Sequence, residues 1–336
     1  MPDACISSLD ATSAVADARP SFPSSTPFGA LPPTAQAALI STGDLFSAEA
    51  VTRHLAHSHY ENFSVVSVLL PKRLRQDFCN IYAFCRVADD LGDEVPDRLE
   101  SLRLLKQFRE MTTACHAGEA TTALFIALAG TIRKYDIPID PFLNLIDAFE
   151  QDQRIFRYDT FEQVVDYCRR SADPVGRLVL YLCGYRDAPR QILSDKICTA
   201  LQLTNFWQDV KKDILDRDRI YLPRESMKKF GVDESQIRQG RIDQNYRNLI
   251  QFEVDRTSQW FDQGEALLPL LGKSVRPQIS LFAKGGRAIL KAIRRQDYDT
   301  LTTRPSLDKW QKGRLILSAF AGYLAGRCTL QTGGQS

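Results

Sequence analysis

The chain has 336 residues, of which 44% are hydrophobic, so it is long enough to bury a sizeable core as one large domain or as two. Its 43 basic and 41 acidic side chains leave a formal charge of only +2, which argues against a nucleic-acid partner and allows at most weak attraction to an anionic membrane surface. Its 8 cysteines lack CxxC spacing and are typical of buried thiols in a reducing compartment.

Residues 1–40 have the composition of a flexible tail. They are rich in Ser, Ala, Thr and Pro, and prolines interrupt every periodic pattern at Pro20, Pro23, Pro27, Pro32 and Pro33. The start of the chain lacks the basic and apolar regions of a secretory signal, and no run approaches the ~18 apolar residues that span a membrane. We therefore predict a cytoplasmic protein and leave peripheral contact with the inner membrane open.

Residues 41–330 are predicted to form one helical domain. From Asp44 onward, helical patterns follow one another without a convincing alternating strand, a credible linker or a repeat. Helix starts are indicated at Pro71, Asp140-Pro141, Thr160-x-x-Gln163 and Asp187-Ala188-Pro189. Further helical patterns cover residues 191–216, 240–271, 276–297 and 307–326. The fold class is therefore all-α.

The helix after Pro71 carries a first pair of carboxylates. Asp89 and Asp93 are four residues apart, a rise of only ~6 Å that returns to the same helix face. Tyr82 and Arg86 share this stripe, and Arg86 is placed to bind phosphate oxygens. A solvated acidic helix end is the alternative, because more carboxylates follow at Asp90, Glu94 and Asp97. Taken alone, the motif favours that alternative.

A second pair of carboxylates, Asp209 and Asp213, lies at the end of a predicted helix. Residues 201–210 of this helix are apolar on nearly every face, which is typical of a buried helix. With Gln202 and Asn205 the pair forms a polar stripe, which is costly inside a protein unless something binds there. The alternative is a set of internal salt bridges, for instance to Lys211 or Lys212. Two such helices facing each other would bring four carboxylates to one cavity, which suits Mg²⁺ that shares its coordination with substrate phosphates. The sequence therefore predicts Mg²⁺-assisted departure of a diphosphate.

Other polar residues are less informative. Arg217 and Arg219 follow the second pair and either clamp the same diphosphate or lie on the surface. The histidines at positions 54, 57 and 59 lack partners for a zinc site, and no Glu-x-x-His pair predicts a di-iron centre. A GxGxxG phosphate loop is also absent.

The two aspartate segments resemble the squalene/phytoene synthase family of head-to-head isoprenoid synthases. The likeness spans about residues 45–310 and includes 82–93, 205–213 with 217–223, Tyr158, Tyr167-Cys168 with 172–176, and 289–299. It implies the all-α isoprenoid synthase fold around a central cavity, with Asp89, Asp93, Asp209 and Asp213 as Mg²⁺ ligands.

Within the family, the motif variants are most similar to the bacterial hydroxysqualene synthase branch. That likeness implies conversion of presqualene diphosphate and water to hydroxysqualene and diphosphate, without NADPH. Tyr60, Asn62 and Phe63 are expected to contact substrate, and the polar residues at 60–62 are candidates for aiming water, because relatives have a serine-rich stretch there. Asp173 stands where the family more often has a small or amide residue, which leaves its role open.

Two alternatives stay open. The chain could condense two prenyl diphosphates as a presqualene diphosphate, squalene or phytoene synthase, since chain length depends on cavity depth. It could also be a non-catalytic assembly factor of the same fold, but such relatives tend to lose the aspartates that this chain retains.

Overall fold

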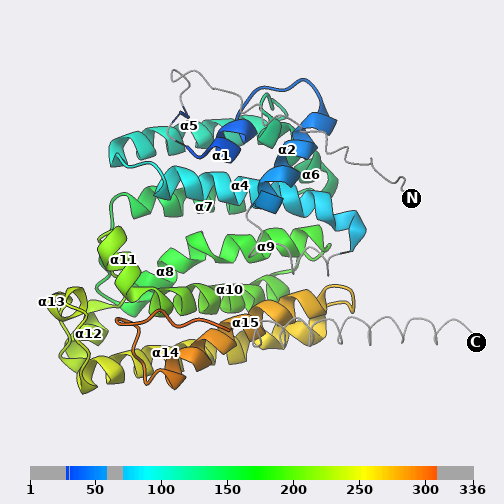
Figure 1. The fold of residues 1–336 in the computed structure, drawn as a ribbon. Coiled ribbons are helices and arrows are strands. Elements are labelled where there is room, and N and C mark those ends of the chain that lie inside the picture. The colour runs from blue at the N-terminus through cyan, green and yellow to red at the C-terminus, as the bar shows by residue number, and fades with distance from the viewer. Residues whose placement is uncertain (1–27, 30, 59–70, 309–336) are drawn as a thin grey trace, which may run out of the picture.

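The structure is a computed structural model that describes residues 28–29, 31–58 and 71–308. Helices make up the architecture of this part of the chain, and the β-type pairs found in it are two isolated bridges, Ser41 with Thr122 and Arg157 with Ile220. Figure 1 shows most of the long helices stacked in roughly parallel layers, with three short helices, α11 (Val210–Asp216), α12 (Arg224–Phe230) and α13 (Glu234–Arg238), gathered at one end. The all-α prediction is confirmed.

The N-terminal half surrounds one hydrophobic core. Its largest fully buried rings are Phe84, Phe108, Phe125 and Phe142, which contact one another edge-on or tilted. The contributing helices are α1 (Pro33–Ala38), α2 (Leu45–Ser58), α4 (Arg75–Asp93), α5 (Arg98–His116), α6 (Ala123–Tyr135) and α7 (Asp140–Asp152), with the short 3-10 turn η1 (Lys72–Leu74) leading into α4. Leu178 and Leu182 of the later helix α9 (Asp173–Leu182) complete this core.

The C-terminal half packs around α10, the helix at its centre. Helix α10 (Ala188–Gln208) contacts the helices α8 (Phe161–Ser171), α9 (Asp173–Leu182), α14 (Gln244–Gly264) and α15 (Arg276–Arg295) and the 3-10 segment η2 (Glu265–Leu270). Trp207 is fully buried in this second core, and its indole N–H donates to Thr257 Oγ1 at 2.8 Å. The burial predicted for the C-terminal part of α10 from its apolar sequence is thus confirmed at Leu203, Phe206 and Trp207.

Several helix starts follow the chemistry that the sequence indicated. Thr160 and Gln163 form a reciprocal capping box at α8, and the Asp187 carboxylate accepts from the N–H of Arg190 at the start of α10. At α7, Pro141 takes the expected early position, but Asp140 lies inside the helix and makes no side-chain cap. The helix begins there because proline has the right φ and needs no N–H partner in the first turn.

The predicted tail is wrong at its C-terminal end. Residues 33–38 form α1, with Pro33 at its start and with Ala35 and Ala38 fully buried. Leu31 and Leu39 belong to the same hydrophobic core. Proline at a first helical turn stabilises rather than breaks a helix, so the domain includes this segment. Residues 1–27 lie outside the described part of the chain.

The described helices include none that is long and apolar enough to cross a membrane. Cys79, Cys85, Cys115, Cys168, Cys183 and Cys198 are free thiols, half-buried or buried, as the sequence predicted.

Candidate functional site

A cavity of about 910 Å³ lies between the two halves of the fold. Its acidic lining comes from α4 through Asp89 and Asp93, from the α10–α11 junction through Asp209 and Asp213, and from the end of α7 through Asp152. Apolar lining comes from α10 and α15, including Leu201, Phe206, Leu281, Phe282 and Ile289. The fold therefore brings the two predicted acidic pairs to one cavity, whose lining is partly charged and partly apolar.

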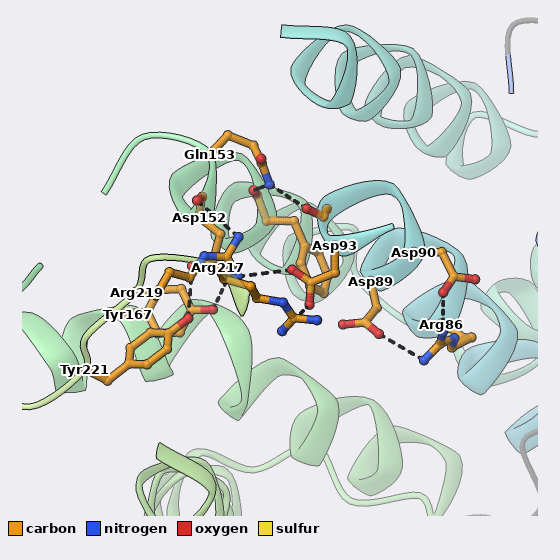
Figure 2. A network of polar contacts seen from close by, with 12 residues as sticks. Arg86, Asp89, Asp90, Asp93, Asp152, Gln153, Tyr167, Arg217, Arg219 and Tyr221 are labelled. Atoms are coloured by element: carbon orange, nitrogen blue, oxygen red, sulfur yellow. Dashed lines mark hydrogen bonds and ion pairs between the residues drawn. The ribbon is translucent and has the colours of Figure 1, made fainter. Parts of the chain in front are cut away.

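The first pair lies on the last turns of α4. Asp89 is 3.2 Å from Nη1 of Arg86 and its side chain is 41% exposed, while the Asp93 side chain is only 13% exposed. Gly92 allows α7 to approach closely here, because a Cβ at this position would lie 3.0 Å from Cδ1 of Phe149. Gln153 Nε2 also donates to the Gly92 carbonyl at 2.7 Å (Figure 2). Close packing of α4 on α7 thus fixes the backbone beside Asp93.

The second pair sits where α10 gives way to α11. Asp209 has φ −107° and ψ 16°, outside regular helix, yet the Asp213 N–H still donates to the Asp209 carbonyl at 2.9 Å. The Asp209 carboxylate is bound by Arg304, with Nη2 at 2.9 Å from Oδ2 and Nε donating to Oδ1. Among the described residues, none forms an ion pair with Asp213. The predicted alternative partners, Lys211 and Lys212, are exposed.

Two arginines join α4 to the segment after α11. Arg217 Nη1 lies 2.8 Å from Asp93 Oδ2, and Arg219 Nη1 donates to Asp93 Oδ1 at 3.1 Å. Figure 2 shows both guanidinium groups pointing to this one carboxylate. The structure thus places Arg217 and Arg219 in the cavity wall rather than on the outer surface.

A second layer supports Arg219. Asp152, at the end of α7, accepts from the Tyr167 hydroxyl at 2.7 Å and lies 3.7 Å from Arg219 Nη1, and its backbone carbonyl accepts from Arg219 Nη2 at 3.2 Å. The Tyr221 ring stacks on Phe206 with centroids 3.7 Å apart. The Asp93 and Asp152 carboxylates and the Asp152 carbonyl together hold the arginine side chain in place.

The acidic groups have perturbed proton affinities. Removal from water, together with repulsion from Asp93, raises the pKa of Asp89 to about 7. Burial and the neighbouring Asp209 raise the pKa of Asp213 to about 7, and burial raises that of Asp152 to about 6. Groups shifted this far by a cavity and like charges are typical of functional sites.

The other candidates from the sequence divide into three groups. Gln202, Asn205 and Phe206 line the cavity. Tyr82 and Arg86 do not line it; Tyr82 is half-buried, and Arg86 forms ion pairs with Asp89 and Asp90 at the edge of the site. Tyr60, Glu61, Asn62 and Phe63 lie outside the described residues, so their contact with substrate stays a prediction.

Asp173, whose role the sequence left open, lies beside a separate cavity of about 360 Å³. Its side chain is buried and accepts from Thr199 Oγ1 at 2.8 Å. Burial and the nearby Asp195 raise the pKa of Asp173 to about 8. It does not line the cavity of the four aspartates.

Sequence reasoning missed three charged residues of the site. Asp90 was assigned only to a solvated helix end, but it is buried and paired with Arg86. Asp152 and Arg304 were not singled out, although both line the cavity. Asp152 ends an apolar helical pattern, which could have marked it. Arg304 follows the last described helix and carries no periodic signal.

The donor set has the chemistry that Mg²⁺ requires. In the described part of the chain, no three acidic, histidine or cysteine side chains are grouped closely enough to hold a metal by themselves. Mg²⁺ is usually bound through one or two carboxylates and completes its shell with waters and substrate phosphates. Hard carboxylate oxygens facing one cavity beside arginines therefore fit ions that are shared with a bound diphosphate.

An all-helical fold with paired aspartates on facing helices around a partly apolar cavity defines the class of isoprenoid synthases. A family model described as squalene/phytoene synthase matches residues 56–311. The chain belongs to this family of enzymes, which join prenyl diphosphates head to head.

Individual relatives agree with this assignment. The phytoene synthase of Thermus thermophilus is 31% identical over 264 residues, covering 78% of this chain and 89% of the relative. The crystal structure of squalene synthase HpnC from Alicyclobacillus acidocaldarius matches with a TM-score of 0.72 and 44% identity, over 82% of this chain and 99% of that one. A dehydrosqualene synthase in complex with a ligand has a TM-score of 0.75 at 24% identity over 84% and 98% of the chains, which shows the shared fold.

Proposed function

We propose that this protein is a hydroxysqualene synthase, which converts presqualene diphosphate and water to hydroxysqualene and diphosphate. The observation that carries the diphosphate chemistry is the convergence of Asp89, Asp93, Asp209 and Asp213 on one cavity beside Arg217, Arg219 and Arg304. The choice of product is supported by the likeness of the sequence motifs to the hydroxysqualene synthase branch. The 44% identity to squalene synthase HpnC, against 31% to a phytoene synthase, favours the squalene side of the family over the phytoene side.

In this proposal the four aspartates would hold Mg²⁺, which would neutralise charge on the diphosphate. Arg217, Arg219 and Arg304 bind the diphosphate oxygens, since guanidinium groups form paired hydrogen bonds with phosphate. The substrate C–O bond breaks with its electron pair going to the diphosphate, and the arginines stabilise that negative charge.

The apolar lining of the cavity stabilises the organic cation that remains and shields it from water. Phe206, stacked on Tyr221, presents aromatic surface to the cavity, and such rings attract cations. Leu281, Phe282 and Ile289 exclude water from most of the chain of the substrate. One water adds its oxygen to the rearranged cation and loses a proton, which yields the alcohol. Tyr60, Glu61 and Asn62 are our candidates for orienting that water.

A second candidate function is the condensation of two prenyl diphosphates. The similarity to the Thermus phytoene synthase favours it, and the same acidic cavity would serve it. Reduction by NADPH to squalene is a further variant, which we do not expect. A non-catalytic role is disfavoured because all four aspartates face the cavity.

Product analysis separates these candidates. Purified protein with Mg²⁺ is incubated with presqualene diphosphate, farnesyl diphosphate or geranylgeranyl diphosphate, each with and without NADPH, and the lipids are identified by mass spectrometry. Hydroxysqualene from presqualene diphosphate alone is the expected result. Phytoene from geranylgeranyl diphosphate would support the second candidate, and squalene formed only with NADPH would refute the proposed product.

A matched pair of variants tests the acidic site. Asp213→Asn is expected to lower turnover by roughly 10²-fold or more, because a carboxylate that acts in the transition state is neutralised. Asp216→Asn is the control, since Asp216 lies on the same helix but is exposed and does not line the cavity. Near-normal turnover of Asp213→Asn would remove Asp213 from the metal site.

A further inference from the structure

The backbone between the two cavity arginines has an unusual conformation. Asp218 lies between Arg217 and Arg219 and has a φ of 54°, in the left-handed region. Residues with a Cβ seldom adopt this region, although aspartate does so more readily than most. The conformation therefore needs support from the surrounding structure.

Two arginines from other segments hold Asp218. Arg157 Nη2 donates to Asp218 Oδ1 at 2.9 Å, and Arg157 Nη1 donates to the Asp218 carbonyl oxygen. Arg238, on α13, donates to the same Oδ1. The Arg157 side chain is only 15% exposed and is itself fixed by Glu234, with Nε to Oε1 at 2.9 Å and Nη2 to Oε2 at 3.0 Å. We call Asp218, Arg157, Arg238 and Glu234 the outer clamp.

The outer clamp lies outside the cavity, because none of its four residues is part of the cavity lining. It holds the chain at a sharp turn. On the near side of the turn, the Asp213 carbonyl accepts from the N–H of Arg217 at 3.2 Å and from the N–H of Arg219 at 3.0 Å. On the far side, the Ile220 N–H donates to the Phe156 carbonyl at 2.9 Å, next to Arg157. The turn thus lies between α11, which carries Asp213, and the strand-like contact with Phe156, which is next to Arg157 of the outer clamp.

The consequence is seen in the side chains on either side of the turn. Both arginines reach Asp93, at 2.8 Å from Arg217 and 3.1 Å from Arg219. The N–H groups of Arg217 and Arg219 donate to the same carbonyl, that of Asp213. If residue 218 had an extended backbone, the Arg219 N–H would point away from this carbonyl. The left-handed turn is therefore what brings both guanidinium groups to one carboxylate.

We propose that Asp218 is a positioning residue, which acts through the outer clamp to aim Arg217 and Arg219 at the diphosphate site. It touches neither Asp93 nor the cavity, so its effect is on the placement of the two arginines. The inference rests on the proposed function, in which these arginines bind diphosphate.

Three variants test this role. Asp218→Gly keeps the left-handed backbone accessible but removes the carboxylate held by Arg157 and Arg238. Asp218→Asn retains an oxygen that accepts from both arginines. Asp136→Gly is the matched control: Asp136 also has a left-handed φ, of 47°, and Arg186 binds both its carboxylate, at 2.7 Å, and its carbonyl, at 3.2 Å. Asp136 does not line the cavity.

The readout is the dissociation constant of inorganic diphosphate in the presence of Mg²⁺, measured by calorimetry, together with KM and kcat for the prenyl diphosphate substrate. Asp218→Gly is expected to weaken diphosphate binding and to raise KM by about tenfold, because small displacements of binding groups have large effects. Asp218→Asn should recover most of the affinity. Asp136→Gly should match the wild type in both measurements, whatever its effect on Tm.

Equal diphosphate binding by wild type and Asp218→Gly would overturn the inference, as would equal losses in Asp218→Gly and Asp136→Gly. Failure of wild-type protein to bind diphosphate with Mg²⁺ would instead contradict the proposed function. In that case crystal structures of wild type and Asp218→Gly decide the positioning role. Loss of the Arg217 and Arg219 ion pairs to Asp93 in the variant supports it, and their retention refutes it.

Discussion

Replacement of Arg219 by glutamine is expected to destabilise the protein strongly. The Arg219 side chain is 8% exposed and is shared between two carboxylates, at 3.1 Å from Asp93 and 3.7 Å from Asp152. Asp93 keeps a second partner in Arg217, but among the described residues no cation other than Arg219 forms an ion pair with Asp152. Arg219→Gln therefore leaves a buried negative charge without a cationic partner, and in this part of the chain only tyrosine hydroxyls still donate to it.

The size of the effect follows from these distances. With an effective dielectric constant of about 20, each N–O pair is worth roughly 4–5 kcal/mol of gross attraction. Part of this is offset because the arginine no longer has to be removed from water, and because a stranded carboxyl can take up a proton. Breaking a buried pair by removing one partner typically costs about 3–5 kcal/mol. We expect a loss of that order in the free energy of unfolding at pH 7.5.

The loss should depend on pH in a defined direction. The pKa of Asp152 is already raised to about 6, mainly by burial, and Arg219 is the main group that lowers it. Without Arg219 the folded-state pKa rises further above the unfolded value, so the variant takes up a proton on folding over a wider range. Its stability therefore falls as pH rises, and the gap to wild type widens from pH 5.5 to 7.5.

Urea denaturation followed by circular dichroism measures this. The double variant Arg219→Gln with Asp152→Asn should recover about 1–3 kcal/mol relative to the sum of the single variants, because the two side chains interact directly. Arg103→Gln is the control, because Arg103 is about half exposed and pairs with Glu100 on the surface, where such pairs contribute under about 1 kcal/mol. Additive single variants, or a loss below about 1 kcal/mol for Arg219→Gln, would refute the reasoning.

Three other substitutions have expected outcomes. Arg304→Gln removes the cation that is bound to Asp209, so calorimetry should show tighter binding of Mg²⁺ alone. The same variant should bind diphosphate with Mg²⁺ about tenfold more weakly, because it lacks a guanidinium group for the phosphate oxygens. The folded-state pKa of Asp173 is raised to about 8 from an ordinary value of 3.8, so wild-type stability should fall between these pH values. Asp173→Asn should remove that loss. Linkage limits the loss to about 4 kcal/mol between pH 5 and pH 8, the two conditions at which urea denaturation measures it. Gly286→Ala would put Cβ 2.5 Å from Cζ of Phe261, and a loss of about 1–3 kcal/mol should lower Tm.

Local sequence signals were sufficient for several helix starts and for the spacing of the acidic pairs. The capping box at Thr160 and the start at Asp187 depend on residues within one turn, so they can be recognised without tertiary information. The four-residue spacing of Asp89 and Asp93 fixed their common face in the same way. That both pairs face one cavity required the packing of α4 against the C-terminal half, and the sequence supplied it only through the family resemblance.

Features that depend on distant partners were not predictable. A single helical pattern covers 191–216, yet the helix is interrupted at Asp209, whose carboxylate is bound by Arg304, 95 residues further along the chain. Residues 33–38 were assigned to a tail because of composition, but the burial of Ala35 and Ala38 against the N-terminal core stabilises a helix there. In both cases tertiary contacts decide between local alternatives.

The charges of the cavity explain why a cation should enter together with the diphosphate. Five aspartates and three arginines line it. A diphosphate is itself strongly anionic, so it would meet a net excess of carboxylate charge unless protons or metal ions compensate. Burial and a neighbouring carboxylate raise the pKa of Asp89 and of Asp213 to about 7, so the arginines nearby do not fully offset the cost of these charges. Divalent ions would satisfy the carboxylates and the diphosphate at once, and would leave the arginines free to turn from Asp93 and Asp209 to phosphate oxygens.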